Sequence, residues 1–235
     1  MSFEVPFTKK NLDLYLRELG KEYRRRGKGV HAELILIGGA SVLINYGFRE
    51  MTYDIDAISM PPTVMKEAVN AVGDRFGLPN GWLNMDFMRT SSYTPRLAEY
   101  AVHYKTFSHV LEVRTIRAEY LLAMKLVSGR RYKKDMSDIV GILIGQARAG
   151  QPLSYEKIDK AVIDLYDDWS RINNDTRTLL LKALETPNLE ELFSEQCAEE
   201  ARSKEVIAEI VQKSPGVVRE NNIQEIIAAA LEKKK

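Results

Sequence analysis

Residues 34–59 read LILIGGASVLINYGFREMTYDIDAIS and contain the most informative pattern of this chain. The first residues of this stretch are apolar, which predicts a short buried strand, and the pair Gly38-Gly39 then predicts a tight turn. Residues 40–46 carry a helical pattern. Residues 52–59, TYDIDAIS, alternate polar and apolar side chains, which is the period of a strand. We therefore expect a strand, a glycine turn, a helix and a second strand in this order.

Asp54 and Asp56 lie two residues apart in the second of these strands, so their side chains share one face, about 6.5 Å apart along the backbone. Two carboxylates held so close repel each other, and burial beside a sheet increases the cost. A divalent cation removes this cost, and Mg²⁺ (or Mn²⁺) prefers oxygen ligands from one or two carboxylates and from substrate phosphates. The pair therefore predicts a metal site.

Gly38 and Gly39 predict the other half of such a site. Glycine permits unusual backbone angles and close approach of a ligand, and the amides and dipole of a helix start attract an anion. Ser41, in the first helical turn, adds a hydroxyl. Alone, an Asp-x-Asp is more often a solvated strand edge and a Gly-Gly more often a simple turn, but the two in this order are more specific. Together they predict a triphosphate held by backbone amides and bridged to the aspartates by magnesium.

Strands and helices alternate up to about residue 128, which predicts a mixed sheet flanked by helices. WLNMDFM, residues 82–88, alternates polar and apolar residues and predicts one of these strands, with Asp86 on its polar face. Later segments all have helical periodicity, separated by Gly, Pro and Asn. We therefore expect an α+β protein, with an α/β domain at residues 1–128 and a helical bundle at residues 129–235.

The composition is that of an ordinary globular protein: 45% of the 235 residues are hydrophobic, 29% are charged, and the net charge is +1. A nucleic acid or a membrane would therefore have to be held by a local patch. The N-terminus lacks the apolar core of a secretory signal, and the longest apolar run is far below the roughly 20 residues that span a bilayer. Cys197 is the only cysteine, and the histidines lack the spacing of zinc ligands. We expect a cytoplasmic protein with neither a disulfide nor a zinc site.

The pair Gly38-Gly39, the following helix with Gly47 and Arg49, and the segment from Thr52 to Asp56 resemble the signature of the nucleotidyltransferase superfamily related to DNA polymerase β. Within it, the chain is most similar to bacterial abortive-infection toxins of the AbiEii type. The segments GWLNMDF, EYLLAMKL and RRYKKDMSDI add to this likeness, which covers about residues 30–145. The helical C-terminal part carries no diagnostic motif.

This resemblance implies an N-terminal nucleotidyltransferase fold and a Mg²⁺-dependent transfer of a nucleoside monophosphate from a nucleoside triphosphate to an acceptor hydroxyl. Gly38 and Gly39 would hold the phosphates, and Asp54 and Asp56 would bind the metal. The superfamily often has a third carboxylate on a later strand, as a metal ligand or general base. Asp86 is the candidate for it and Glu112 is the competitor.

Two basic residues have alternative explanations. Lys125 lies among apolar helical neighbours, where a solvated or snorkelling lysine is common, but the resemblance places it near the phosphates, where it would neutralise the leaving pyrophosphate. Arg49 lies shortly before Thr52, as in the family, and would pair with Asp54 or with phosphate. Both are therefore candidates for nucleotide binding.

The partners of the chain are less defined. The acceptor is RNA, a protein side chain or a small molecule, and the family analogy adds an antitoxin partner but no membrane. A second class of function is a catalytically inactive module on the same fold, which binds a nucleotide or a partner, for example through the acidic helical stretch 185–209. A nucleic-acid binder has only the runs RRRGKG and RRYKK in its favour, without interleaved stacking aromatics.

Overall fold

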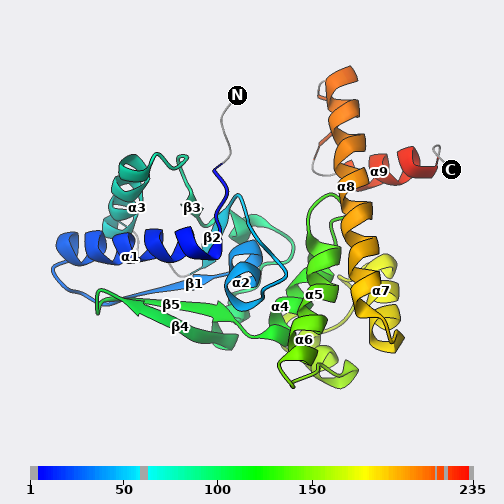
Figure 1. Cartoon of the computed structure of the whole chain (residues 1–235), viewed down its shortest axis with the longest axis horizontal. Coiled ribbons are helices and arrows are strands. Elements are labelled where there is room, and N and C mark those ends of the chain that lie inside the picture. The colour runs from blue at the N-terminus through cyan, green and yellow to red at the C-terminus, as the bar shows by residue number, and fades with distance from the viewer. Residues whose placement is uncertain (1–4, 59–62, 215, 220–221, 233–235) are drawn as a thin grey trace. The chain divides into compact units, whose positions relative to one another are not determined.

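The computed structural model describes residues 5–58, 63–214, 216–219 and 222–232. The chain, drawn in Figure 1, divides into two compact units. The first comprises residues 1–124 and 158–167, and the second residues 125–157 and 168–235. The first boundary thus lies after Met124, four residues before the position expected from sequence, and a later segment returns to the first unit.

The first unit contains a five-stranded sheet. In chain order its strands are β1 (Ala32–Leu36), β2 (Ile55–Ile58), β3 (Leu83–Asn84), β4 (Ala101–Phe107) and β5 (Leu111–Ile116). Their spatial order is β3-β2-β1-β5-β4. The pairs β1–β5 and β2–β3 are parallel, whereas β1–β2 and β4–β5 are antiparallel. The expected mixed α+β architecture is therefore confirmed.

Two helices, α1 (Lys9–Arg26) and α3 (Thr63–Phe76), lie side by side on one face of this sheet (Figure 1). Thr8 begins α1 with a capping box, in which its hydroxyl accepts from the amide of Asn11 and the side chain of Asn11 accepts from the amide of Thr8. The apolar stripes of both helices pack with alternate residues of β1, β2 and β5 in one core cluster. Ile55 and Ala57 belong to this cluster, so the polar residues between and beside them face away from it.

The segment after β3 differs from the expected strand. Only Leu83 and Asn84 pair with β2, and the 3₁₀ helix η1 begins at Asp86 (Asp86–Arg89). The reason is local: the side-chain oxygen of Asn84 accepts from the amide of Asp86 at 2.8 Å, which turns the chain out of the sheet. The alternation that predicted a longer strand is therefore interrupted by a turn that an asparagine stabilises.

The remaining elements of the first unit connect its strands. They are α2 (Gly38–Asn45), η2 (Pro95–Tyr100) and most of α4 (Ala118–Ser128) and α6 (Tyr155–Tyr166). Tyr166 donates its hydroxyl to the carbonyl of Ser92 at 2.7 Å, and Tyr120 donates to Asp164 at 2.7 Å. These bonds join α6 to the first unit, although it lies far away in the sequence.

In the described part of the second unit, every regular element is a helix. The helices that lie wholly in this unit are α5 (Asp135–Arg148), α7 (Asn174–Glu185), α8 (Leu189–Lys213) and α9 (Ile223–Glu232). α5 is buried along its first ten residues and packs against α7 and α8. Across all the described helices, none combines the length and the apolar character that a membrane span needs.

Candidate functional site

The glycine turn and the second aspartate lie next to each other in the first unit. The amide of Ile37, the last residue before the turn, donates to the carbonyl of Asp56 at 3.0 Å. A Cβ atom built on Gly38 would lie 3.7 Å from Oδ2 of Asp56. This juxtaposition follows from the antiparallel pairing of β1 with β2, because the end of one strand then meets the start of the other.

Each glycine of the pair is required for a different reason. Gly38 has φ +55°, a left-handed conformation that disfavours other residues. At Gly39 a Cβ atom would lie 2.6 Å from Oγ1 of Thr52 and 2.9 Å from a guanidinium nitrogen of Arg49. The glycine pair, expected as a turn before the helix, thus forms the first two residues of α2: Gly38 allows the change of direction after β1, and Gly39 allows two polar side chains to approach.

The start of α2 is suited to an anion. Its N-cap residue, Ile37, is extended and offers no side-chain acceptor, so the helix has no side-chain cap. The first amides of a helix have no partner within the helix, and the helix dipole adds positive potential there. Arg49 adds a full positive charge beside Gly39, and its Nε donates to the carbonyl of Met51 at 3.3 Å. Amides and a guanidinium group therefore converge at the turn.

The two aspartates differ in their surroundings. Asp54 directly precedes β2 and is exposed, whereas Asp56 lies within β2 and is half-buried. Thr52 donates its hydroxyl to Oδ1 of Asp54 at 3.1 Å. Thr52 is itself buried, and its backbone forms two hydrogen bonds with Phe7, of 2.7 and 2.9 Å. These hydrogen bonds fix the backbone at Thr52, two residues before Asp54.

The hydroxyl of Ser41 contacts the end of β5. Ser41 is fully buried, and its Oγ accepts from the amide of Ile116 at 3.3 Å and from the side chain of Asn45 at 3.4 Å. This hydroxyl therefore attaches α2 to the end of β5. A contact between Ser41 and phosphate stays a prediction.

Neither candidate for the third carboxylate has a described contact with the acid pair. Asp86 lies on η1 with 74% of its side chain exposed, and its nearest cation is Arg89, 3.6 Å away. Glu112 lies on β5, 3.4 Å from Nδ1 of His103. Among the residues that the structure describes, no three His, Cys, Asp or Glu side chains form a group that could hold a metal ion.

Asn84 is the residue that sequence reasoning missed. It lies on β3 in register with Asp56, and paired residues of neighbouring strands share a face of the sheet. Its side chain also donates to the carbonyl of Gly81 at 3.2 Å. The position beside Asp56 is thus occupied by an amide. A sequence offers no signal for this, because the register of two strands is set by their packing.

Lys125 takes part in a buried ionic cluster of the second unit. Its Nζ lies 2.7 Å from Asp135 and 2.8 Å from Asp138, and all three side chains are at most 5% exposed. Arg130 and Ser128 also donate to Asp135, at 2.8 and 2.7 Å. Burial raises the pKa of Asp135, but the charges of Lys125 and Arg130 outweigh it and hold this pKa below its ordinary value. A contact of Lys125 with phosphate stays a prediction.

Four arginines of the two basic runs are paired with acids. Arg25 and Arg26 donate to Glu22 at 2.5 and 2.7 Å at the end of α1. Arg130 pairs with Asp135, and Arg131 pairs with Asp175 at 2.6 Å. These contacts favour a structural role for the arginines over a nucleic-acid surface.

A family model described as "Nucleotidyltransferase of unknown function (DUF6036)" matches residues 15–186 of the chain. The match includes the glycine turn, the acid pair and the whole sheet. No curated protein and no solved structure gives a significant match.

Proposed function

We propose that this chain, which belongs to the family Nucleotidyltransferase of unknown function (DUF6036), transfers a nucleoside monophosphate from a nucleoside triphosphate to an acceptor hydroxyl and releases pyrophosphate. The observation that carries the proposal is the approach of Asp56 to the start of α2, 3.7 Å from the Cβ position of Gly38. In this proposal the start of α2 binds the anion, and Asp56 supplies a carboxylate beside it. Phosphoryl transfer needs this combination, because its transition state is stabilised mainly by positioning and by charge.

In this proposal the amides at Gly38 and Gly39 bind the phosphates, and Arg49 supplies a fixed positive charge beside them. Asp54 and Asp56 hold Mg²⁺ or Mn²⁺. The donor set fits such an ion, since Mg²⁺ usually takes one or two protein carboxylates and completes its octahedron with water and substrate phosphates. When bound, the ion would neutralise charge that develops on the phosphates during the transfer.

Two hydroxyls support these groups. Thr52 orients Asp54 through the 3.1 Å hydrogen bond, so the carboxylate is positioned before a ligand arrives. Ser41 attaches the first turn of α2 to β5, which fixes the direction of the amides at the glycine pair. Both residues are positioning residues in this scheme.

The acceptor hydroxyl must lose a proton, and we propose Asp86 as the base, with Glu112 as its competitor. Asp86 is exposed and close to a strand that pairs with β2, so it is accessible to an acceptor that binds from solvent. A second candidate function is a nucleotide-binding module without transferase activity. It is favoured by the side-chain amide of Asn84, which lies in register with Asp56 where a third carboxylate would be expected. A chain without a third carboxylate would bind a nucleotide and not transfer it, and would serve as a sensor or a partner-binding module.

The biological setting is proposed on family analogy alone. A toxin of the AbiEii type would modify RNA or protein in its host and would be neutralised by an antitoxin. Induced expression of the wild type and of the double variant Asp54→Asn/Asp56→Asn in a bacterial host tests this role. We expect growth arrest with the wild type only; equal growth of both strains would contradict it.

Transfer itself is tested by incubating the protein with each α-labelled nucleoside triphosphate, Mg²⁺ and either total RNA or total protein. We expect one macromolecular class to become labelled, and we expect Asp54→Asn/Asp56→Asn to abolish the labelling. Asp74→Asn, on the exposed face of α3, is the matched control and should keep full activity. If the protein binds a nucleotide but labels neither class nor itself, this would favour the sensor, or a small-molecule acceptor, over transfer to RNA or protein.

A further inference from the structure

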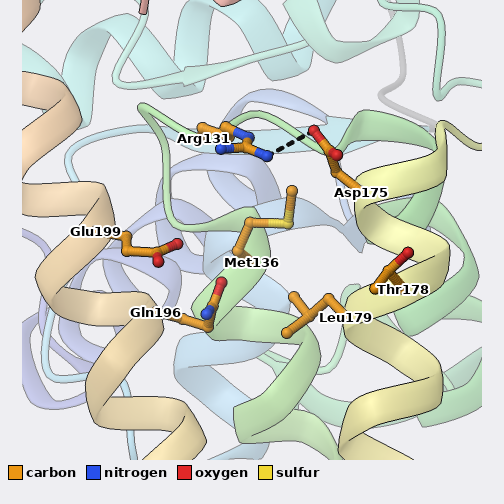
Figure 2. Close-up of a pocket in the computed structure, with 7 residues that line it drawn as sticks. All are labelled: Arg131, Met136, Asp175, Thr178, Leu179, Gln196 and Glu199. Atoms are coloured by element: carbon orange, nitrogen blue, oxygen red, sulfur yellow. Dashed lines mark hydrogen bonds and ion pairs between the residues drawn. The ribbon is translucent and has the colours of Figure 1, made fainter. Parts of the chain in front are cut away.

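A hollow of about 230 Å³ lies in the second unit and is formed by side chains of α5, α7, α8 and the segment before α5 (Figure 2). It is lined by Arg131, Met136, Asp175, Thr178, Leu179, Gln196 and Glu199. Met136 and Leu179 supply its apolar floor, and each is at most 8% exposed. The volume is below the roughly 300–1,000 Å³ of sites for drug-sized molecules. It is suited to one side chain or a molecule of similar size.

The polar side chains around this floor are of two kinds. Arg131 and Asp175 form an ion pair of 2.6 Å at one side, so their charges cancel. Gln196 and Glu199, both on α8, make no side-chain hydrogen bond or ion pair with any described residue, and Figure 2 shows both directed toward the hollow. The remaining net charge at the hollow is therefore the negative charge of Glu199, with an amide beside it.

We infer that this hollow binds the side chain of a lysine or an arginine from a partner polypeptide. The methylene groups of such a side chain would cover Met136 and Leu179, and its cationic head would reach Glu199 and the amide oxygen of Gln196. Both residue types combine an apolar stem with a positive head, which matches an apolar floor with a carboxylate at its edge. The inference is independent of nucleotide transfer.

A neighbouring surface extends the same site. Thr178 also lines a second, more open hollow of about 470 Å³, together with Leu181, Lys182, Glu185 and Thr186. Leu181 is 48% exposed there and supplies apolar surface. The charge of Lys182 is paired with Glu195 at 3.0 Å, and Glu185 adds a second carboxylate to the site. Residues that flank the inserted side chain would pack on this surface. A polypeptide fits the two adjoining hollows better than a free small cation, which would fill only the first.

The probe is a series of capped tripeptides, Ala-X-Ala, with X as lysine, arginine, norleucine or glutamate, and the free polyamine spermidine. Binding to the full chain is followed by NMR through the ¹³C-labelled methyl group of Met136, assigned with Met136→Leu. We expect the lysine or the arginine peptide to shift this signal and to bind at least tenfold more tightly than the norleucine peptide. The glutamate peptide should have no effect. Glu199→Gln should remove this preference, whereas Glu205→Gln, an exposed glutamate of the same helix, should keep it.

Three results would overturn the inference: equal affinity for lysine, arginine and norleucine, an unchanged preference in Glu199→Gln, or tighter binding of spermidine than of either basic peptide. The last would assign the site to a free cation. Thermal unfolding of each variant establishes that it is folded. Nucleotide binding, measured on the same samples, keeps a failure here distinct from a failure of the proposed transferase.

Discussion

Oγ1 of Thr52 lies 3.1 Å from Oδ1 of Asp54 and 2.6 Å from the point where Gly39 would carry a Cβ atom. One buried hydroxyl thus orients a carboxylate proposed to bind metal, and also fills the space left open by a glycine at the start of α2. The glycine pair and the acid pair are therefore parts of one packed arrangement. A substitution in the glycine pair should therefore alter the position of the acid pair, and a substitution in the acid pair should alter the glycine pair.

Gly39→Ala should destabilise the protein and weaken nucleotide binding. The new methyl group would meet Thr52 and Arg49 at 2.6 and 2.9 Å, and overpacking of this kind costs about 1–3 kcal/mol in the free energy of unfolding. Urea denaturation measures the loss. The control is Gly47→Ala, because a Cβ atom at Gly47 meets nothing within 4 Å. A Gly39→Ala protein as stable as this control would show that the close approach is not present in solution.

Thr52→Val should lower the Mg²⁺-dependent affinity for a nucleoside triphosphate about tenfold. The substitution keeps the shape but removes the donor to Asp54, and a hydrogen bond to a charged group contributes about 1.5 kcal/mol. Thr52→Ser keeps the hydroxyl and should retain most of the affinity. Calorimetric titration with and without Mg²⁺ checks both. If Val and Ser variants bind alike, Thr52 does not position the carboxylate.

The sequence predicts the part of the site that is local in the chain. The apolar run, the glycine pair and the alternation around Asp54 and Asp56 lie within 26 residues, and the described structure has β1, α2 and β2 in that order. The strand pairing then brings Gly38 to Asp56. The position of Asp86 is harder to predict from sequence. It depends on whether Asn84 continues the strand or stabilises a turn, and the hydrogen bond of 2.8 Å from the amide of Asp86 to Asn84 favours the turn.

Lys125→Met should destabilise the protein by about 3–5 kcal/mol, because it leaves Asp135 and Asp138 buried beside each other without the shared ammonium group. Lys182→Met is the control: its pair with Glu195 is exposed and should contribute less than about 1 kcal/mol. Chemical denaturation gives both values. Equal small effects would mean that the buried cluster does not need Lys125.

Glu200 makes the second unit sensitive to pH. It is 5% exposed on α8 and accepts from the amide and hydroxyl of Ser137 at 2.9 and 2.7 Å. The pKa of Glu200 is raised to about 7: burial raises it most, the two bonds from Ser137 lower it, and the charges of Asp138 and Asp135 raise it. The folded state therefore binds this proton more tightly than the unfolded chain, whose carboxyl has an ordinary pKa near 4.5.

The stabilisation from the protonated Glu200 is complete below about pH 4.5 and is lost as the pH rises toward 7. Glu200→Gln keeps a neutral side chain at all pH values. It should therefore be more stable than the wild type at pH 8, by up to about 3 kcal/mol, and the two should converge near pH 4.5. Thermal unfolding between pH 4.5 and 8 measures this, with Glu205→Gln as control. A difference that is independent of pH would contradict the assignment.

The assignment of chain segments to the two units is not predicted by the sequence. Residues 158–167 have the helical periodicity of the segments around them, yet they belong to the first unit through Tyr166 and Ser92. The hollow of the second unit likewise combines residues from 131 to 199. Such groupings depend on long-range packing, for which neither periodicity nor a short motif gives a signal.

We propose that a nucleoside triphosphate is held at the start of α2 with a divalent ion at Asp54 and Asp56. Isothermal titration of a non-hydrolysable triphosphate, with Mg²⁺ and with excess chelator, tests it most directly. We predict binding that requires Mg²⁺ in the wild type and in Asp74→Asn, and that is lost in Asp54→Asn/Asp56→Asn. Binding that is unaffected by the chelator or by the double substitution, or no binding by folded wild-type protein to any of the four triphosphates, would contradict the claim.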